Sequence, residues 1–146
     1  MKLIVVVPTY NEADNVEPMV EALLDLGLAD LSVLIVDDES PDGTGQIADA
    51  QAAQYPQRVH VIHRTALRGL GRAYVDGFRW ALDHGGDLIV QMDCDFSHSP
   101  QCIPEFVERI EDYDVVIGSR YVEGGKTDER WGWGRWALSW WANSVY

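Results

Sequence analysis

The sequence predicts an α/β fold with a mostly parallel central sheet that is covered by helices on both faces. Short apolar runs rich in β-branched residues alternate along the chain with stretches of helical periodicity. Several of these runs are continuously apolar, as expected of strands that are buried on both faces. The unusual polar clusters follow the apolar runs, and in parallel sheets ligands bind at the carboxyl ends of the strands. These observations indicate βαβ units joined by right-handed crossovers.

Taken in order, the apolar runs predict five strands, at residues 3–7, 31–36, 59–63, 87–92 and 115–117. Four helices are predicted after the first four strands, over residues from about 16 to 27, 44 to 55, 69 to 84 and 100 to 110. In the first helix the apolar residues recur at three- and four-residue spacing, and Gly27 is expected to end it. No internal repeat or linker divides the chain.

Composition limits the function classes that fit. The 146 residues are enough for one domain with a real core. The formal net charge of -13 argues against nucleic acid as a partner, because a phosphate backbone requires Lys and Arg. The same charge favours a cation that bridges the protein to a phosphate ester, with solubility alone as the other interpretation.

Cysteine usage and hydropathy indicate the compartment. Cys94 and Cys102 have no C-x-x-C spacing, so a disulfide framework or a zinc site is not expected, and both are predicted to be thiols in a reducing cytoplasm. The first eight residues lack a signal-peptide cleavage site. No stretch reaches the roughly 20 apolar residues that a membrane-spanning helix needs.

The acidic stretch 92–98 (MDCDFSH) is the centre of the predicted site. Side chains alternate along a strand, so Asp93 and Asp95 point to the same side where the fourth strand ends. Two carboxylates so close repel each other unless a cation lies between them, and Mg²⁺ or Mn²⁺ suits such oxygen ligands. A solvated acidic turn is the alternative. An EF-hand does not fit, since His98 and Pro104 stand where Gly and Glu are required.

Four polar clusters are expected to converge at one edge of the sheet. They occupy residues 9–12, 37–42, 93–98 and 119–120, and each follows a predicted strand. Around them, Arg64, Arg68 and Arg72 flank a glycine turn and are predicted to form a solvated face, with contact to a phosphate as the alternative. His98 either contacts a diphosphate or caps the turn.

Other nucleotide chemistries fit less well. Residues 43–48 match the G-x-G-x-x-A pattern of dinucleotide binding, but the match does not follow the first strand and is preceded by repelling carboxylates. The P-loop pattern is absent from the sequence. The acidic stretch also resembles that of aspartyl-phosphate phosphatases, although Ser97 occupies the position of their Thr or Val. A phosphatase and a non-catalytic nucleotide-binding module therefore stay as alternatives from other classes.

Four stretches of the sequence form one set of motifs: 7–12 (VPTYNE), 35–42 (IVDDESPD), 92–98 (MDCDFSH) and 117–122 (IGSRYV). In register, they resemble the inverting glycosyltransferases of family 2, and among them the polyprenyl (dolichyl) phosphate mannosyltransferases. The resemblance covers nearly the whole chain. It implies the GT-A fold, a Rossmann-like α/β/α sandwich with a mostly parallel central sheet.

The resemblance also implies roles for individual residues. Nucleotide binding falls to Pro8, Tyr10, Glu12, Val36, Asp38, Asp93 and Cys94. The metal, Mg²⁺ or Mn²⁺, is assigned to Asp93 and Asp95 with Ser97 as a further ligand. The acceptor phosphate is assigned to Arg120, and to Arg135 and Ser139 of a W-x-x-x-R-x-x-x-S stretch. Asp93, Asp95 and Arg120 are the implied catalytic residues.

The implied reaction moves mannose from GDP-mannose onto a polyprenyl or dolichyl phosphate. Another family 2 reaction, from UDP-glucose to a lipid phosphate or a polysaccharide, is the alternative. A polyprenyl phosphate is already anionic and attacks the anomeric carbon without a dedicated general base, so catalysis needs positioning and neutralisation of the leaving diphosphate. The missing Ser-His-Asp or Cys-His arrangement is therefore expected, and glycosidase chemistry is not required.

The end of the chain departs from the family pattern. Residues 1–125 are predicted to form the nucleotide-sugar-binding core, and residues 126–146 to begin an acceptor or membrane-interface helix region of the same domain. Trp140 stands where these synthases carry Lys or Arg. Family members continue well past the position of Tyr146, so the chain is expected to be a partial protein.

Five of the six Trp cluster near this end, at positions 131, 133, 136, 140 and 141. Trp favours the headgroup region of a bilayer, and helical spacing would place most of these rings near one face. The segment is predicted to lie flat on a membrane, with packing against a further part of the protein as the alternative. The expected localisation is cytoplasmic, peripheral at the cytoplasmic face of the membrane.

Overall fold

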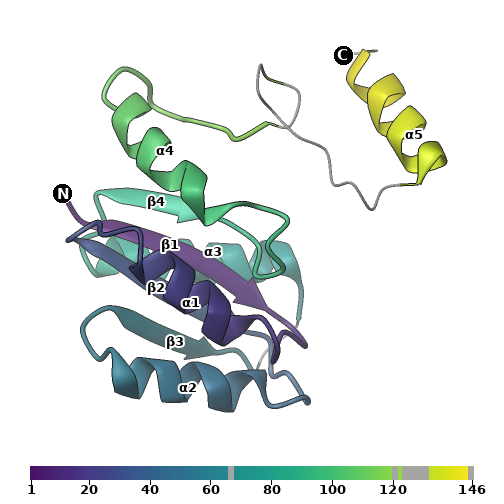
Figure 1. Cartoon of the computed structure of the whole chain (residues 1–146). Helices are drawn as coiled ribbons and strands as arrows, with labels where there is room; N and C mark the ends of the chain where they lie inside the picture. The colour runs from purple at the N-terminus through teal and green to yellow at the C-terminus, as the bar shows by residue number, and fades with distance from the viewer. Residues whose placement is uncertain (66–67, 120–121, 123–131, 145–146) are drawn as a thin grey trace.

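A four-stranded parallel sheet lies between two layers of helices in the computed structural model (Figure 1). The structure describes residues 1–65, 68–119, 122 and 132–144. The strand order is β3-β2-β1-β4. The strands are β1 (Leu3–Thr9), β2 (Leu31–Asp37), β3 (Val59–His63) and β4 (Leu88–Gln91). All pairings are parallel, with Leu3 opposite Leu31 on one side of β1 and opposite Leu88 on the other.

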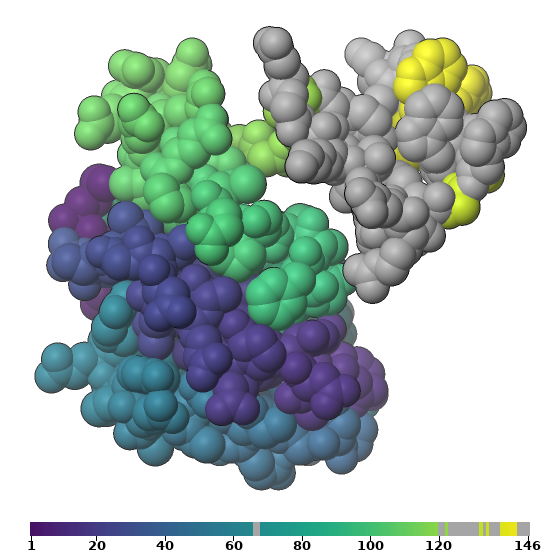
Figure 2. Space-filling view, in the orientation of Figure 1, coloured from purple at the N-terminus to yellow at the C-terminus, as the bar shows by residue number. Residues whose placement is uncertain are grey.

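The core follows from the alternation of side chains along the strands. On one face, Val5 and Val7 of β1 belong to the larger cluster of buried residues, together with residues of α1, α2 and α4. On the other face, Ile4 and Val6 pack against α3 in a smaller cluster. Figure 2 shows side chains of α1 and α2 closing over the first of these faces. The predicted two-sided burial of the first strand is confirmed, because every residue of β1 is buried.

The helices occur where periodicity predicts them. They are α1 (Val16–Leu24), α2 (Thr44–Gln54), α3 (Leu70–Asp83), the 3₁₀ turn η1 (Pro100–Cys102), α4 (Ile103–Arg109) and α5 (Trp133–Ser144). Gly27 lies in the turn after α1 with a φ of +70°, a left-handed conformation that glycine adopts without a steric cost. Its N–H donates to the carbonyl of Leu24.

The predicted fifth strand is wrong. Residues 115–117 have no strand structure, and the side chains of Val115 and Ile117 are 71% and 80% exposed. A strand forms only where a neighbour accepts its backbone hydrogen bonds, and within the described residues the sheet has four strands. The apolar triplet signals β propensity but carries no information about a pairing partner.

Helix α5 forms over the tryptophan-rich segment and stands apart from the sheet layers in Figure 1. Its described apolar side chains are exposed, at 74% for Leu138, 57% for Trp140 and 64% for Trp141. Among the residues that the structure describes, no helix is long and apolar enough to cross a membrane. The predicted boundary between residues 125 and 126 lies outside the described residues, so this division stays a prediction.

Candidate functional site

The turns that follow β1, β2 and β4 meet at one edge of the sheet, because parallel strands end together. Each turn contains a non-glycine residue in the left-handed region: Asn11 at φ 60°, Glu39 at φ 54° and Phe96 at φ 59°. Such a conformation costs about 1 kcal/mol and persists only where surrounding contacts impose it. Backbone strain therefore concentrates at the edge where the sequence predicts a ligand.

Asp37 joins the first two of these turns. Its buried carboxylate accepts a hydrogen bond of 3.1 Å from the Thr9 hydroxyl at the end of β1. It also accepts hydrogen bonds from the Ser40 hydroxyl at 2.6 Å and from the Ser40 N–H at 3.1 Å. Asp37 thus has an architectural role at the junction of these two turns.

Side chains that follow β2 also hold the backbone of the turn after β1. The N–H of Asn11 donates to the Ser40 hydroxyl at 3.0 Å, and the N–H of Glu12 donates to the Thr44 hydroxyl at 2.9 Å. Thr44 in turn donates its hydroxyl to Asp42 at 2.6 Å. That hydrogen bond is the main reason why the pKa of Asp42 is lowered. The two turns form one hydrogen-bonded unit.

Arg64 lies buried behind these turns, at the end of β3, and corrects the prediction of a solvated arginine face. Its side chain is 5% exposed and forms ion pairs with Asp38 and, at 2.7 Å, with Asp76 of α3. The second oxygen of Asp38 accepts the N–H of Gly69 at 2.8 Å. The hydrogen bond to Asp76 is the largest cause of the raised pKa of Arg64, followed by the opposing effect of burial and by Asp38. The ion pairs of Arg64 and the hydrogen bond from Gly69 to Asp38 together connect the end of β2 to the start of α3.

Arg68 and Tyr10 form a polar and aromatic pair at the surface of the same edge. The guanidinium lies 4.9 Å from the centre of the Tyr10 ring, within range of a cation–π contact. It also donates to the Tyr10 hydroxyl at 3.0 Å and to the carbonyl of Glu39 at 3.2 Å. The Tyr10 ring is 46% exposed, so one side of it remains available to a planar ligand.

The acidic turn after β4 has an ordered set of hydrogen bonds. Asp95 accepts the N–H of Ser97 at 2.9 Å, and the hydrogen bonds from Ser97 lower the pKa of Asp95. The N–H of Asp93 donates to Nδ1 of His98 at 3.2 Å, and Nε2 of His98 lies 4.0 Å from Oδ2 of Asp93. Tyr74 of α3 donates its hydroxyl to Oδ1 of Asp93 at 2.9 Å.

Cys94 points away from its two acidic neighbours. Its side chain is 2% exposed and belongs to the larger core cluster. Burial raises the pKa of the Cys94 thiol to about 12, and the carboxylates of Glu12, Asp95 and Asp93 act in the same direction. Burial alternates along this turn, with Cys94 inward, Asp93 half-buried and Asp95 exposed.

Asp93 and Asp95 are the candidates for holding a divalent cation that is shared with a phosphate ligand. Within the described part of the chain, no group of three or more His, Cys, Asp or Glu side chains is arranged to hold a metal ion. Mg²⁺ and Mn²⁺ do not need such a cage, because Mg²⁺ is usually held by one or two carboxylates together with substrate phosphates and waters. Asp93 and Asp95 are the two carboxylates at the sheet edge that could take this role, and hydrogen bonds from Ser97 lower the pKa of Asp95.

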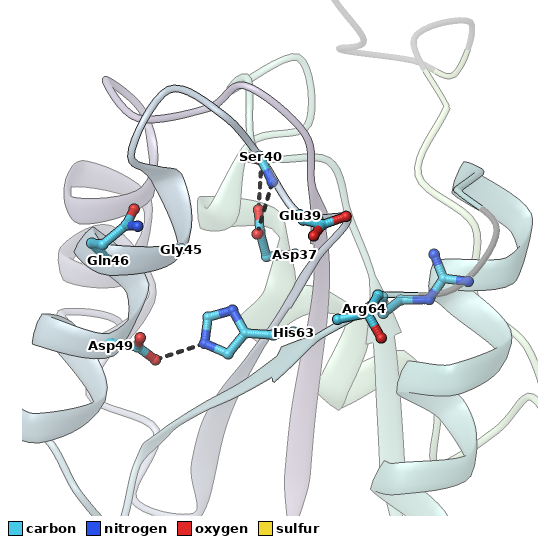
Figure 3. A pocket seen from close by; sticks show the side chains of 9 residues that line it. Asp37, Glu39, Ser40, Gly45, Gln46, Asp49, His63 and Arg64 are labelled. Carbon is cyan, nitrogen blue, oxygen red and sulfur yellow. Dashed lines mark hydrogen bonds and ion pairs between the residues drawn. The ribbon is translucent and has the colours of Figure 1, made fainter.

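A shallow hollow of about 150 Å³ opens beside the acidic edge, between the start of α2 and the end of β3 (Figure 3). Its lining residues include Asp37, His63 and Gly45. A Cβ atom at Gly45 would lie 3.2 Å from Oδ2 of Asp37 and 3.2 Å from Cε1 of His63, so glycine keeps this hollow open. Nothing in the sequence indicates the hollow, because its lining residues come from separate segments.

Some of the remaining predicted residues lie in the described part of the chain, and others lie outside it. Pro8 and Val36 face each other in the β1–β2 register, and Glu12 accepts a hydrogen bond of 2.7 Å from Asn15. Ser139 lies on α5 and is half-buried. Arg120 and the side chain of Arg135 lie outside the described residues.

Two residues of the site were not predicted as such: Arg64 and Tyr74. In the sequence Tyr74 is one aromatic residue at a helical position, and nothing marks its hydroxyl as a partner of the acidic turn. The ion pair of Arg64 with Asp76 and the hydrogen bond of Tyr74 with Asp93 both depend on how α3 packs across the sheet. The periodicity of the sequence does not specify this packing.

Known proteins resemble the chain along its whole length. It is 47% identical over 146 residues to undecaprenyl-phosphate mannosyltransferase of Micrococcus luteus, covering 100% of this chain and 58% of that protein. It is 44% identical over 144 residues to polyprenol monophosphomannose synthase of Mycolicibacterium smegmatis, covering 98% of this chain and 54% of that protein. The chain therefore spans about half the length of these relatives.

Solved structures agree with the GT-A fold class predicted from the sequence. A mannosyltransferase from Pyrobaculum calidifontis in complex with GDP-Man and Mn²⁺ superposes with a TM-score of 0.67 at 26% identity, covering 82% of this chain and 36% of that chain. Mannosyl-3-phosphoglycerate synthase from Rubrobacter xylanophilus shares the fold, with a TM-score of 0.59 at 22% identity over 77% of this chain and 37% of that one. Residues 4–144 match the family described as Glycosyl transferase family 2. The chain therefore belongs to glycosyl transferase family 2.

Proposed function

We propose that the protein is an inverting, metal-dependent glycosyltransferase that moves mannose from GDP-mannose onto a polyprenyl or dolichyl phosphate. The observation that carries the proposal is the placement of Asp93 and Asp95 in one turn, at the same sheet edge as the hydrogen-bonded turns after β1 and β2. The names of the Micrococcus and Mycolicibacterium relatives support the acceptor class, and the complex of the Pyrobaculum enzyme supports the donor and the metal.

The nucleotide is assigned to the edge formed by Pro8, Tyr10, Glu12, Val36 and Asp38. The exposed Tyr10 ring offers a flat surface for the base, and Arg68 fixes the orientation of that ring. Asp38 already accepts from Arg64 and Gly69. A carboxylate has about four acceptor positions, and Asp38 is only 6% exposed, so the base or the ribose would reach it through that small exposed part. The backbone near Cys94 completes this edge, because the thiol itself is buried.

Asp93 and Asp95 would hold the cation, with Ser97 as a further ligand. The cation, when bound, supplies positive charge to the diphosphate of the donor and so stabilises the leaving group. Ser97 has a second role already, because its N–H holds Asp95 in place. His98 lies on the Oδ2 side of Asp93 and caps the turn through the Asp93 N–H, which is one of the two roles predicted for it.

The acceptor phosphate is assigned to Arg120, Arg135 and Ser139. These donors would neutralise the phosphate and orient one of its oxygens for in-line attack on the anomeric carbon. A phosphate monoester is already ionised at neutral pH, so the attacking oxygen has no proton to lose. The reaction consequently requires no residue that acts as a general base.

The activity test uses the protein in its full natural length. Incubation with labelled GDP-mannose, Mn²⁺ and a polyprenyl phosphate is expected to give a labelled lipid and free GDP. Inorganic phosphate without lipid labelling would instead support the phosphatase alternative, and binding without turnover would support a nucleotide-binding module. A parallel reaction with UDP-glucose tests the donor, since preferential transfer of glucose would contradict the assignment of mannose.

The acceptor lipid implies contact with a membrane surface, which we assign to residues 126–146 at the cytoplasmic face. Replacing Trp136 and Trp140 together by Ala is expected to reduce co-sedimentation of the full-length protein with liposomes, because Trp favours the headgroup region. Trp140 is exposed on α5 and thus accessible to lipid. The matched control replaces Val75 and Leu82, two exposed apolar residues of α3, by Ala. Equal sedimentation of the Trp variant and the wild type would place the membrane contact elsewhere.

A further inference from the structure

Tyr74 connects the helix layer to the acidic turn. It lies in the second turn of α3, and its side chain packs in the smaller core cluster, where Ala73 and Val36 are also buried. Its ring stacks on Phe78 with a centroid distance of 5.8 Å. The residue is only 6% exposed. Packing therefore fixes the position of the ring, and with it the position of the hydroxyl.

The fixed hydroxyl contacts one oxygen of one carboxylate. The Tyr74 hydroxyl donates to Oδ1 of Asp93 at 2.9 Å. The other oxygen, Oδ2, lies on the side of His98, whose Nε2 is 4.0 Å away and so beyond hydrogen-bond distance. The Asp93 side chain is 41% exposed, so the carboxylate would turn more freely without the tyrosine. Its two oxygens thus have different surroundings, one held by a phenol and one facing the turn.

The phenol is suited to this contact because its O–H donates and a carboxylate oxygen accepts. Hydrogen bonds to ligating carboxylates orient them towards a metal, and the loss of such partners typically weakens metal affinity about 10- to 100-fold.

We propose that Tyr74 is a positioning residue that orients the Asp93 carboxylate so that Oδ2 is presented to the divalent cation and the donor diphosphate. This inference rests on the proposed function of the same site. It assigns to α3, which carries none of the predicted ligands, a part in metal affinity. Tyr74 acts through Asp93 and does not itself contact the substrate.

The test compares Tyr74→Phe with the wild-type full-length protein. Phenylalanine keeps the packed ring and removes only the hydroxyl, so the fold is expected to persist. GDP binding is measured by calorimetry over a range of Mn²⁺ concentrations and again in EDTA. We expect about 10-fold more Mn²⁺ to be needed for half-maximal GDP binding. The GDP affinity in EDTA should be unchanged, and saturating Mn²⁺ should restore the wild-type affinity.

Tyr55→Phe is the matched control. The Tyr55 ring also packs against the core, and its hydroxyl accepts a hydrogen bond of 2.9 Å from Gln54, away from the acidic turn. This variant is expected to keep the wild-type Mn²⁺ dependence. An unchanged Mn²⁺ requirement in Tyr74→Phe would overturn the inference, as would a loss of GDP affinity that also appears in EDTA. A wild-type protein without any Mn²⁺-dependent GDP binding would instead overturn the metal-dependent function itself.

Discussion

The substitutions Asp93→Asn and Asp95→Asn are each expected to abolish Mn²⁺-dependent GDP binding while leaving the fold intact. Each substitution removes one of the two negative charges that would hold the cation, and an amide oxygen is a weaker ligand for a hard cation than a carboxylate. Asparagine has nearly the size and shape of aspartate, and both side chains lie at the sheet edge outside the core clusters. The substitutions should therefore leave the packing of the core unchanged. Calorimetric titration of GDP with and without Mn²⁺ measures the effect.

Asp83→Asn serves as the control for the loss of one negative charge. Asp83 is exposed at the end of α3, beside His84, whose carbonyl accepts a hydrogen bond from Lys2 at the edge of the sheet where β1 begins, opposite to the acidic turn. This variant should bind GDP and Mn²⁺ as the wild type does. Unchanged Mn²⁺-dependent GDP affinity in both Asp93→Asn and Asp95→Asn, with circular dichroism confirming the fold, would remove the acidic turn from the metal site.

Replacement of Arg64 by Met is expected to lower the free energy of unfolding by about 3 kcal/mol, the cost of leaving a buried charge without its partner. Met approximates the length of the aliphatic part of Arg, so the loss arises mainly from charge. The Asp38 carboxylate would then be buried with one hydrogen bond, from Gly69, in place of an ion pair. Urea denaturation followed by fluorescence gives the change.

Arg79→Met is the matched control, because Arg79 pairs with the same Asp76. That pair has an N–O distance of 3.8 Å, and the Arg79 side chain is 75% exposed, so its loss should change stability by less than about 1 kcal/mol. Equal destabilisation by the two substitutions would show that burial of Arg64 has no special importance. Restored stability in Arg64→Met/Asp38→Asn would confirm that the unpaired carboxylate is the cause.

The sequence predicted the four strands of the sheet because their apolar runs leave little alternative. The run at β1 has no polar residue between Leu3 and Val7, so only a strand buried on both faces accommodates it. The acidic turn was also predictable, because Asp93 and Asp95 come directly after an apolar run and lie in the turn that follows β4. In each case the signal lies within one short segment.

Individual side-chain contacts between distant segments could not be predicted. A lone arginine usually lies in solvent, and Arg64 is buried only because its partners, 12 and 26 residues away, come together at the sheet edge. The strand predicted at residues 115–117 is wrong for a related reason. Its apolar residues favour a strand locally, but in the described structure no neighbouring strand pairs with them. The left-handed φ of Asn11 likewise follows from hydrogen bonds between turns, not from its own sequence neighbours.

The order of the strands has a consequence for how the protein folds. β4, which carries the acidic turn, pairs with β1, and the hydrogen bond from Lys2 to Asp87 at the start of this pairing spans 85 residues. Such non-local contacts slow folding, because a long loop must close before they form. Until β4 docks, β1 presents an open edge that is able to pair with another chain. Late docking of β4 would therefore expose the folding chain to aggregation, and the same step would delay formation of the acidic turn at the sheet edge.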